Sequence, residues 1–225
     1  MPAGSALDEG GVALAPTSGK VPEATLWRLS LYLRCLRQLA KEGVTTISSA
    51  KMEAHCGIVP PQIRKDLSYF GEFGKPGTGY DVQHLLERLT ETMQLDRKHP
   101  TVIVGAGNLG SALAGYSGFG PSPFDIVAIF DNNFNKIGRM LWDLEILDVN
   151  HLPEINRELK AEIGIIAVPA ESAQQVMDIL VKAGVRGVLN FAPALIDVSA
   201  DVALRNVDLT RELEVLSYHL NRPAK

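Results

Sequence analysis

Cysteine is scarce in this sequence, which holds only Cys35 and Cys56 among its 225 residues. Their spacing matches no metal-binding or redox motif, and two isolated cysteines are typical of a protein kept in a reducing cytosol. No apolar run approaches the roughly 20 residues that a membrane-spanning helix needs. The first residues also lack the basic start and the continuous apolar stretch of a secretory signal. The sequence therefore predicts a cytoplasmic protein with no metal site and no membrane partner.

Charged residues make up 21% of the chain and hydrophobic residues 46%, which excludes a disordered, collagen-like or coiled-coil protein. The charge is unevenly distributed. Residues 20–76 hold nine Lys or Arg against five acidic residues, whereas residues 77–225 hold thirteen against nineteen. A basic block joined to a more acidic body favours a module that binds a polyanion. Ordinary variation could also produce this excess, so the charge alone does not decide the function.

The N-terminal part of the chain changes character near residue 20. Residues 1–19 are mostly small residues and proline, which cannot bury enough surface to offset the loss of entropy, so a flexible tail is predicted. An amphipathic helix is predicted over residues 22–41, with Pro22 in its first turn and Gly43 after its end. Its apolar stripe is formed by Leu26, Leu29, Leu33, Leu36 and Leu39.

Two short helices are predicted over residues 49–56 and 60–70, with Gly57 in the turn between them and Ser48 or Ser49 capping the first. A glycine-rich segment, residues 71–80, and an amphipathic helix over residues 82–93 follow. This order is typical of a winged helix-turn-helix, whose second short helix lies in the major groove of DNA. The residues expected to contact DNA are Gln62, Arg64, Lys65, Ser68 and Tyr69 on that helix, and Lys75 at the tip of the wing.

These side chains suit different parts of a DNA duplex. Arg64 and Gln62 can read base edges, whereas Lys65, Ser68 and Tyr69 can bind phosphates. The alternative is a small helical interaction module whose charges are simply solvated, because groups of three short helices are common.

After residues 97–100 the periodicity changes, and apolar runs of strand length alternate with helical stretches. Strands are predicted over residues 101–104, 126–130, 163–168, 185–191 and 202–207, with a helix over residues 172–183. Continuous apolar runs are typical of buried parallel strands. The second part of the chain is therefore predicted to be a parallel α/β sheet.

A glycine-rich turn directly follows the first of these strands. Gly105 allows a tight turn from strand to helix, Gly107 lets the backbone approach a pyrophosphate, and Gly110 lets the helix lie close to the strand. Asp131 ends the next strand, where an acidic residue can accept hydrogen bonds from both ribose hydroxyls and repel a 2′-phosphate. The pattern predicts a Rossmann-like site for NAD(H) rather than NADP(H), the alternative being a turn without a ligand. Its loop residues are Gly105, Ala106, Gly107, Asn108, Leu109 and Gly110.

Five segments of the chain resemble those of the bacterial redox-sensing transcriptional repressor family Rex, in the family's order. They are residues 64–71, the wing ending at Gly79-Tyr80, residues 105–110, residues 190–193 and residues 206–208. The resemblance implies a winged-helix domain over residues 20–98 that binds double-stranded operator DNA, and a Rossmann domain over residues 99–206 that binds NADH and NAD⁺. It also implies a homodimer that exchanges its C-terminal helix, within residues 207–225, and releases DNA on binding NADH.

The resemblance suggests roles for three further residues. Tyr116 matches a tyrosine near the nicotinamide, and Asp208 matches an aspartate that pairs with Arg34 in one state and with Tyr116 in the other. The alternatives are a surface arginine, a core tyrosine and a helix cap. An apolar nicotinamide pocket is expected near Val168, Pro169, Asn190, Phe191 and Pro193.

Two positions depart from the family pattern. Pro76 stands in the wing where related sequences often carry a second base, and Val59 precedes the recognition helix where a polar cap is expected. We expect weaker contact with the minor groove and a less firmly held helix start.

Two enzymatic interpretations compete with a repressor. A dehydrogenase needs a substrate site, but only residues 207–225 follow the Rossmann unit, too few for a substrate domain, although Tyr116 suits such an enzyme. A CoA- or nucleotide-binding enzyme subunit would not explain the winged helix. A non-enzymatic, ligand-controlled repressor explains both halves.

The last helix, residues 209–220, presents Leu209, Leu213, Leu216 and Leu220 on one face, which either packs on its own domain or exchanges in the dimer.

Overall fold

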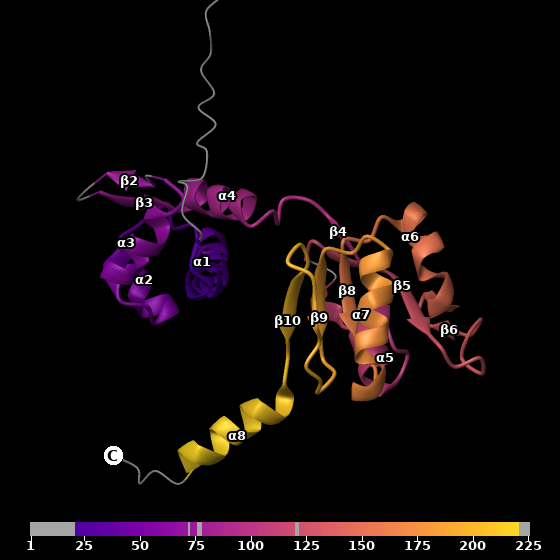
Figure 1. Ribbon diagram of the computed structural model, residues 1–225. Helices are drawn as coiled ribbons and strands as arrows, with labels where there is room; N and C mark the ends of the chain where they lie inside the picture. The colour runs from indigo at the N-terminus through magenta and orange to yellow at the C-terminus, as the bar shows by residue number, and fades with distance from the viewer. Residues whose placement is uncertain (1–20, 72, 76–77, 120–121, 221–225) are drawn as a thin grey trace, which may run out of the picture. The chain divides into compact units, whose positions relative to one another are not determined.

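The computed structural model describes residues 21–71, 73–75, 78–119 and 122–220, which form two compact units divided between Asp96 and Arg97 (Figure 1). The predicted tail, residues 1–19, and the departure at Pro76 lie outside the described residues. The division falls two residues before the predicted boundary. It leaves residues 207–220 in the second unit.

Four helices and a small sheet build the first unit. The helices are α1 (Glu23–Lys41), α2 (Ser49–Cys56), α3 (Pro60–Ser68) and α4 (Val82–Thr92). The antiparallel sheet has the order β1-β3-β2, from β1 (Thr46–Ile47), β2 (Gly74–Lys75) and β3 (Gly79–Asp81). The α1 stripe packs into the core as predicted, except that Leu26 is exposed, and Pro22 is the N-cap of α1 rather than part of its first turn.

The turn between α2 and α3 explains how α3 begins without a polar cap. Gly57 ends α2 in a left-handed conformation with φ of 68°, while the hydroxyl of Ser48 caps the start of α2. Val59 is the N-cap of α3 and offers no side-chain hydrogen bond, but Pro60 and Pro61 follow it. Because proline has no N–H, two of the donors that a cap would satisfy are absent. The helix therefore needs less capping than the sequence suggested.

The end of α3 and the wing differ slightly from expectation. The helix ends at Ser68, two residues earlier than predicted, and Tyr69 is its C-cap. Strands β2 and β3 form a hairpin in which Lys75 pairs with Gly79. Lys75 is thus the last residue of β2, next to residues 76–77, which lie outside the described part of the chain.

The second unit is built on a seven-stranded sheet with the order β10-β9-β8-β4-β5-β7-β6. All neighbours are parallel except β6 and β7. The five predicted strands are present as β4 (His99–Val104), β5 (Phe124–Asp131), β8 (Ile163–Ile166), β9 (Gly187–Asn190) and β10 (Ala203–Asn206). The sequence interpretation did not include β6 (Met140–Leu141) and β7 (Leu144–Asp148), which extend one edge.

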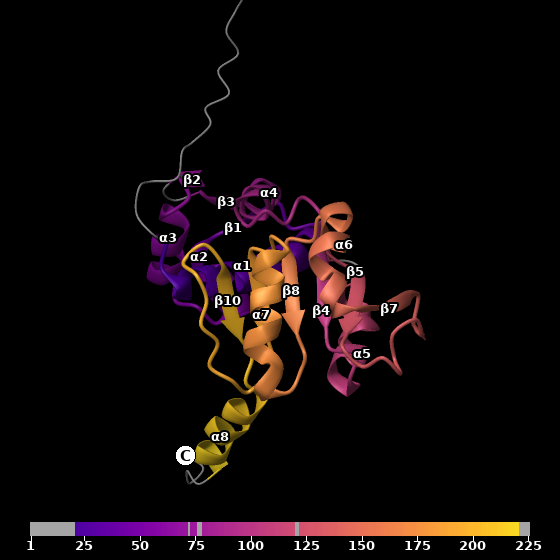
Figure 2. The ribbon, with the colours of Figure 1, turned by 45° about the vertical axis from the view of Figure 1, so that its right-hand side comes forward.

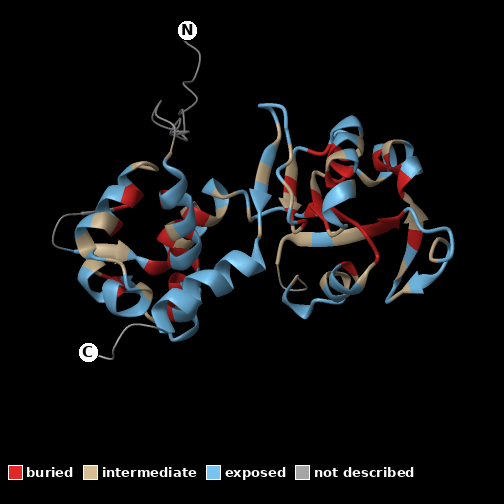
Figure 3. Ribbon diagram, turned by 60° about the horizontal axis from the view of Figure 1, so that its bottom comes forward, coloured by how far each residue is buried: buried red, intermediate tan, exposed pale blue. Residues whose placement is uncertain are grey.

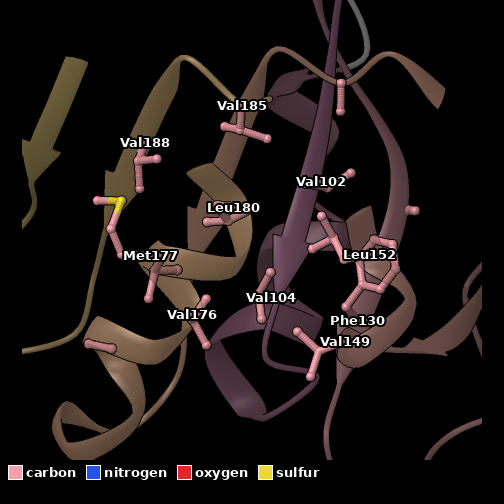
Figure 4. Close-up of a cluster of buried hydrophobic side chains, with 14 of the residues drawn as sticks. Val102, Val104, Phe130, Val149, Leu152, Val176, Met177, Leu180, Val185 and Val188 are labelled. Carbon is pink, nitrogen blue, oxygen red and sulfur yellow. The ribbon is translucent and has the colours of Figure 1, made fainter. Parts of the chain in front are cut away.

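Helices cover both faces of this sheet. The α-helices are α5 (Asn108–Ala114), α6 (Leu152–Leu159), α7 (Ala173–Lys182) and α8 (Leu209–Leu220), and the short 3₁₀ helices are η1 (Ser117–Phe119), η2 (Val149–His151) and η3 (Ala170–Ser172). Figure 2 shows α7 lying along β8. The core between the sheet and helices α6 and α7 includes Val102, Phe130, Leu152, Met177 and Leu180 (Figure 4). On the other face α5 packs near Ile103, so successive residues of β4 point to opposite sides.

Helix α8 differs from the other helices of this unit because every one of its residues is exposed (Figure 3). Its apolar face does not pack on its own unit: Leu209, Leu213, Leu216 and Leu220 are 61%, 66%, 57% and 84% exposed. Of the helices in the described residues, none is long and apolar enough to cross a bilayer.

Candidate functional site

The glycine loop between β4 and α5 has the close approaches that only glycine permits. A Cβ atom on Gly105, whose φ is +109°, would lie 2.4 Å from the carbonyl oxygen of Ala167, and one on Gly110 would lie 1.8 Å from the carbonyl oxygen of Gly105. At Gly107 a Cβ would meet no described heavy atom within 4 Å. The first and third glycines thus hold the loop tightly against the sheet, and the second borders open space where a ligand can approach the backbone.

A pocket of about 510 Å³ lies beside this loop. Its walls come from the carboxyl ends of β4, β5, β7 and β8 and from α7, which is where open α/β sheets bind ligands. Of the residues predicted to bind the cofactor, the lining includes Gly105, Gly107, Asp131, Val168 and Pro169. The lining does not include Ala106, Asn108, Leu109, Gly110, Tyr116, Asn190, Phe191 or Pro193.

Asp131, the last residue of β5, is 7% exposed and lies in the pocket wall. Its Oδ2 accepts hydrogen bonds from the N–H of Ala106 at 2.8 Å and from Nζ of Lys136 at 2.9 Å, and its Oδ1 accepts one from the N–H of Asn133 at 2.8 Å. Burial by itself would raise the pKa of Asp131, but Lys136 and the two N–H groups hold that pKa below its ordinary value. The charged carboxylate therefore links the glycine loop to the end of β5.

Polar residues that the sequence interpretation missed also line the pocket. They are Asn132, Asn133, Lys136, Asn150, Ser172 and Gln175. Lys136 stands five residues after Asp131, so a basic residue soon after the acid was a usable signal. Ser172 and Gln175 reach the pocket from the start of α7, and no local pattern joins them to the glycine loop.

The loop after β9 is shaped by Asn190, which is 1% exposed. Its Nδ2 donates to the carbonyl of Ala192 at 3.0 Å and to Oδ1 of Asn206 at 2.9 Å, while its Oδ1 accepts from the N–H of Ala192 at 2.8 Å. Phe191 is half-buried, and Pro193 is exposed. Asn190 thus supports the loop that carries these two residues.

The three residues of the expected switch have different surroundings. Tyr116 is 57% exposed just after α5, and its ring packs edge-on against Phe119 with centroids 5.1 Å apart. Asp208 caps α8, because its Oδ1 accepts from the N–H groups of Thr210 at 3.0 Å and Arg211 at 3.1 Å. Arg34 is exposed on α1, in the first unit. The helix cap, the alternative role of Asp208, is therefore present.

Helix α3 presents Arg64, Lys65 and Ser68 as exposed side chains. Arg64 donates from Nη1 to the hydroxyl of Ser49 at 3.0 Å, and the hydroxyl of Ser68 donates to the carbonyl of Lys65 at 2.7 Å. Tyr69 is half-buried. Gln62 differs from these side chains because its Nε2 donates at 2.8 Å to a carboxylate oxygen of Asp66, a fully buried residue.

Comparison with known proteins relates both units to one kind of protein. A family model described as "Putative DNA-binding protein N-terminus" matches residues 20–68, and one described as "CoA binding domain" matches residues 96–194. A "Redox-sensing transcriptional repressor Rex" from Carboxydothermus hydrogenoformans is 50% identical over 90% of this chain and 98% of its own. One from Desulforamulus reducens is 47% identical over 89% of this chain and 96% of its own.

Solved structures agree with this result. The complex of RSP with beta-NAD⁺ and operator DNA has a TM-score of 0.86 and 40% identity, covering 91% of this chain and 94% of that one. The complex of RSP with beta-NADH has a TM-score of 0.80 and 38% identity, covering 91% of this chain and 96% of that one. RSP is described as a Rex-family repressor.

Proposed function

The chain belongs to the Rex family of redox-sensing transcriptional repressors, and from this membership we propose which of its residues bind operator DNA, hold the nucleotide and link the two sites. It is a DNA-binding repressor, not an enzyme, and it senses NADH and NAD⁺. The observation that carries this conclusion is that relatives matching about nine-tenths of the chain are repressors, which sets aside the dehydrogenase and the enzyme subunit. We place its activity in the cytoplasm, where bacterial operator DNA lies.

The nucleotide pocket fits a dinucleotide in size and in chemistry. Its volume of about 510 Å³ is typical of small-molecule sites. The open space at Gly107 and the start of α5 suit a pyrophosphate, so we assign the loop from Gly105 to Gly110 to that group. Asp131 is assigned to the ribose of the adenosine. Its two oxygens offer about four acceptor positions, of which three are used, so we expect one ribose hydroxyl rather than two to donate to it.

The other end of the pocket is assigned to the nicotinamide. The bound nucleotide supplies a ring that is neutral when reduced and positively charged when oxidised. Val168 and Pro169 are in the pocket lining. Tyr116, Phe191 and Pro193 are assigned to complete this end, and Asn190 holds the loop that carries Phe191 and Pro193. Burying an unpaired cation against apolar side chains is costly, so this end favours NADH over NAD⁺.

DNA is assigned to α3 and the wing. We assign Arg64, which is exposed on α3, to a base, and Lys65, Ser68 and Tyr69 to phosphates. Lys75 is assigned to the wing's contact with DNA from its place in the sequence. Gln62 is assigned a supporting role because its amide is engaged with Asp66.

A homodimer is proposed from two uncovered apolar surfaces. The leucine face of α8 is exposed on its own unit. One face of the sheet also carries an open groove of about 370 Å³ with almost wholly apolar walls, which include Ile126, Ile165 and Leu189. We propose that the two subunits exchange their α8 helices, so that both apolar surfaces are buried from solvent.

The two sites are linked by a residue that can serve only one partner fully at a time. We propose that Asp208 pairs with Arg34 of the other subunit in the DNA-bound state and with Tyr116 in the NADH-bound state. NADH-favoured closure of the dimer would change the separation of the two α3 helices, which must match half-sites about one helical turn apart.

The DNA assignment is tested with a duplex that the unmodified chain selects from a random-sequence pool, called here the operator duplex. Replacing Arg64 by Ala should weaken binding to it by about 1–3 kcal/mol, because a bidentate contact with a guanine is lost. Replacing Lys65 by Ala should weaken operator and scrambled duplexes alike and reduce the salt dependence, because a phosphate contact is lost. Fluorescence anisotropy at several salt concentrations measures both effects. Unchanged DNA binding by the variant that combines Arg64→Ala with Lys65→Ala would contradict the assignment of α3 to the DNA interface.

A further inference from the structure

A buried charge lies at the centre of the DNA-binding unit. The carboxylate of Asp66, on α3, is 0% exposed. It accepts hydrogen bonds from Thr25 Oγ1 at 3.1 Å, Arg28 Nη2 at 2.8 Å, Tyr32 Oη at 2.7 Å and Gln62 Nε2 at 2.8 Å. Arg28 also donates from Nε to the second carboxylate oxygen, so the pair is bidentate.

The four donors join two helices. Thr25, Arg28 and Tyr32 follow each other at spacings of three and four on α1, which places them on one helix face. Gln62 lies one turn before Asp66 on α3. The carboxylate thus connects the recognition helix to the longest helix of the unit.

This connection keeps Asp66 ionised. Burial alone would raise the pKa of Asp66, but the hydrogen bonds from Arg28, Tyr32, Gln62 and Thr25 outweigh burial and lower it. Burial and the hydrogen bond to Asp66 together raise the pKa of Tyr32, so its hydroxyl stays protonated and donates. A fixed anion with fixed donors imposes one geometry, whereas apolar packing tolerates several.

The rotation of α3 about its axis decides where its exposed side chains point. Arg64 and Lys65 precede Asp66 directly in the sequence and face solvent, while Asp66 faces α1. Each residue advances the helix by about 100°, so Arg64 and Lys65 face away from α1 when Asp66 faces it. Because both side chains are long, a small rotation of α3 about its axis displaces their charged ends.

We propose that Asp66 is the positioning residue of the recognition helix, and that Gln62 supports operator recognition through Asp66 rather than by reading a base. This proposal rests on the proposed contact of α3 with operator DNA. It makes DNA sequence recognition depend on a residue that has no exposed surface.

Asp66→Asn tests the proposal with a side chain of nearly the same shape. The amide nitrogen of Asn would face the guanidinium of Arg28, so the clamp loses its charge and its bidentate pair. We expect affinity for the operator duplex to fall by about tenfold, while affinity for a scrambled duplex changes by less than about twofold. NADH affinity, measured by calorimetry, should not change.

Glu91→Gln is the matched control. It removes the same charge from the same unit, at the exposed pair of Glu91 with Arg88 on α4. Loss of a negative charge should by itself favour binding to DNA, so a weaker operator complex in Asp66→Asn is opposite to the electrostatic effect. We expect Glu91→Gln to bind both duplexes as the unmodified chain does, within about twofold.

A double-mutant cycle tests the role of Gln62. If Gln62 acts through Asp66, Gln62→Ala should weaken operator binding in the unmodified chain and add nothing in the Asp66→Asn background. Effects that multiply in the double variant would show that Gln62 contacts DNA independently and would overturn that part of the proposal.

Tyr32→Phe keeps the test decisive if Asp66→Asn does not fold, because it removes one donor and keeps the ring. It should weaken operator binding more than scrambled binding, with thermal unfolding recorded on the same samples. Folded variants that bind the operator duplex normally, or that lose both duplexes equally, contradict the positioning role. An unmodified chain that selects no preferred duplex would instead overturn the assignment of α3 to operator recognition, and the positioning role with it.

Discussion

Asp131 and Lys136 form an ion pair in the wall of the proposed nucleotide pocket, with a distance of 2.9 Å between Nζ and Oδ2. The carboxylate alone would repel the 2′-phosphate of NADPH, whereas the ammonium group attracts it. The preference for NADH over NADPH that we propose therefore depends on both residues. An acidic residue at the end of the second strand is an incomplete signal of specificity when a base lies beside it.

Removing the base should sharpen the preference for NADH. In Lys136→Met the charge of Asp131 is no longer offset, so the ratio of NADPH to NADH dissociation constants should rise by about tenfold, or about 1.4 kcal/mol. Asp131→Ala should lower the same ratio, because the carboxylate that repels the 2′-phosphate is lost. Calorimetry with both nucleotides measures it, and Lys182→Met, at the exposed end of α7, is the control for net charge. An unchanged or lower ratio in Lys136→Met would contradict a role of Lys136 at the 2′ position.

Glu162 joins the amino-terminal ends of three strands, at the end of the sheet opposite the pocket. It precedes β8 and accepts hydrogen bonds from Arg97 at 3.1 and 2.9 Å, from His99 of β4 at 3.1 Å and from Arg186, just before β9, at 3.3 Å. The hydrogen bonds from Arg97 and His99 lower the pKa of Glu162, although burial opposes them. A carboxylate whose pKa is lower in the folded state stabilises the protein above its unfolded pKa, and that stabilisation disappears as the pH falls through the folded pKa.

The second unit should therefore lose stability in acid partly through this residue. Glu162→Gln should lower the unfolding temperature at pH 7 and reduce the fall in unfolding temperature below about pH 4. Thermal unfolding followed by circular dichroism over a pH series measures both effects. Glu158→Gln, an exposed residue of α6, is the control. Equal acid sensitivity in Glu162→Gln and the unmodified chain would contradict the assignment.

The leucine face of α8 is exposed on its own unit, and we propose that it packs on the partner subunit. Leu213→Asp places a charge in the middle of the leucine face and should convert dimers to monomers, because an unpaired carboxylate would be buried between subunits. Val215→Asp makes a similar change at an exposed position of α8 outside the leucine face and should leave the dimer intact. Size-exclusion chromatography with light scattering gives the masses. A monomeric unmodified chain, or a dimeric Leu213→Asp, would contradict the exchange of α8.

The elements that could be predicted are those whose signal is local. The leucine stripe of α1 repeats within one continuous segment, and the glycine loop and the apolar runs of β4 and β8 each occupy a few consecutive residues. Strands β6 and β7 were missed because Asp143 and Glu145 interrupt their apolar pattern at an exposed sheet edge. Asp66 was missed for another reason: a carboxylate within a basic segment gives no sign of burial until the helices that supply its donors are packed.

The whole molecule acts as a switch only if its two sites are energetically coupled. Coupling is a free energy, and a nucleotide shifts the DNA-binding state only by as much as its affinities for the two states differ. The proposed relay assigns this difference to the exchange of Asp208 between Arg34 and Tyr116. The cap that Asp208 forms on α8 gives the same carboxylate a structural role as well.

Two variants of Asp208 separate these roles. Asp208→Ala removes both the cap and the relay, and loss of such a cap costs about 1 kcal/mol of stability. Asp208→Ser retains a capping hydroxyl but no carboxylate, so it should restore the stability of the helix and still uncouple the sites. Tyr116→Phe should bind NADH while releasing DNA less effectively. Normal coupling in Asp208→Ser would assign the aspartate to the cap alone.

The redox switch is tested most directly by the affinity of the unmodified chain for its operator duplex with and without saturating NADH, at one stated salt concentration. We expect NADH to weaken binding by about tenfold or more and NAD⁺ not to weaken it, and we expect Tyr116→Phe and Asp208→Ser to reduce the ratio. Equal operator affinities with NADH, with NAD⁺ and without nucleotide would contradict a repressor that senses redox state.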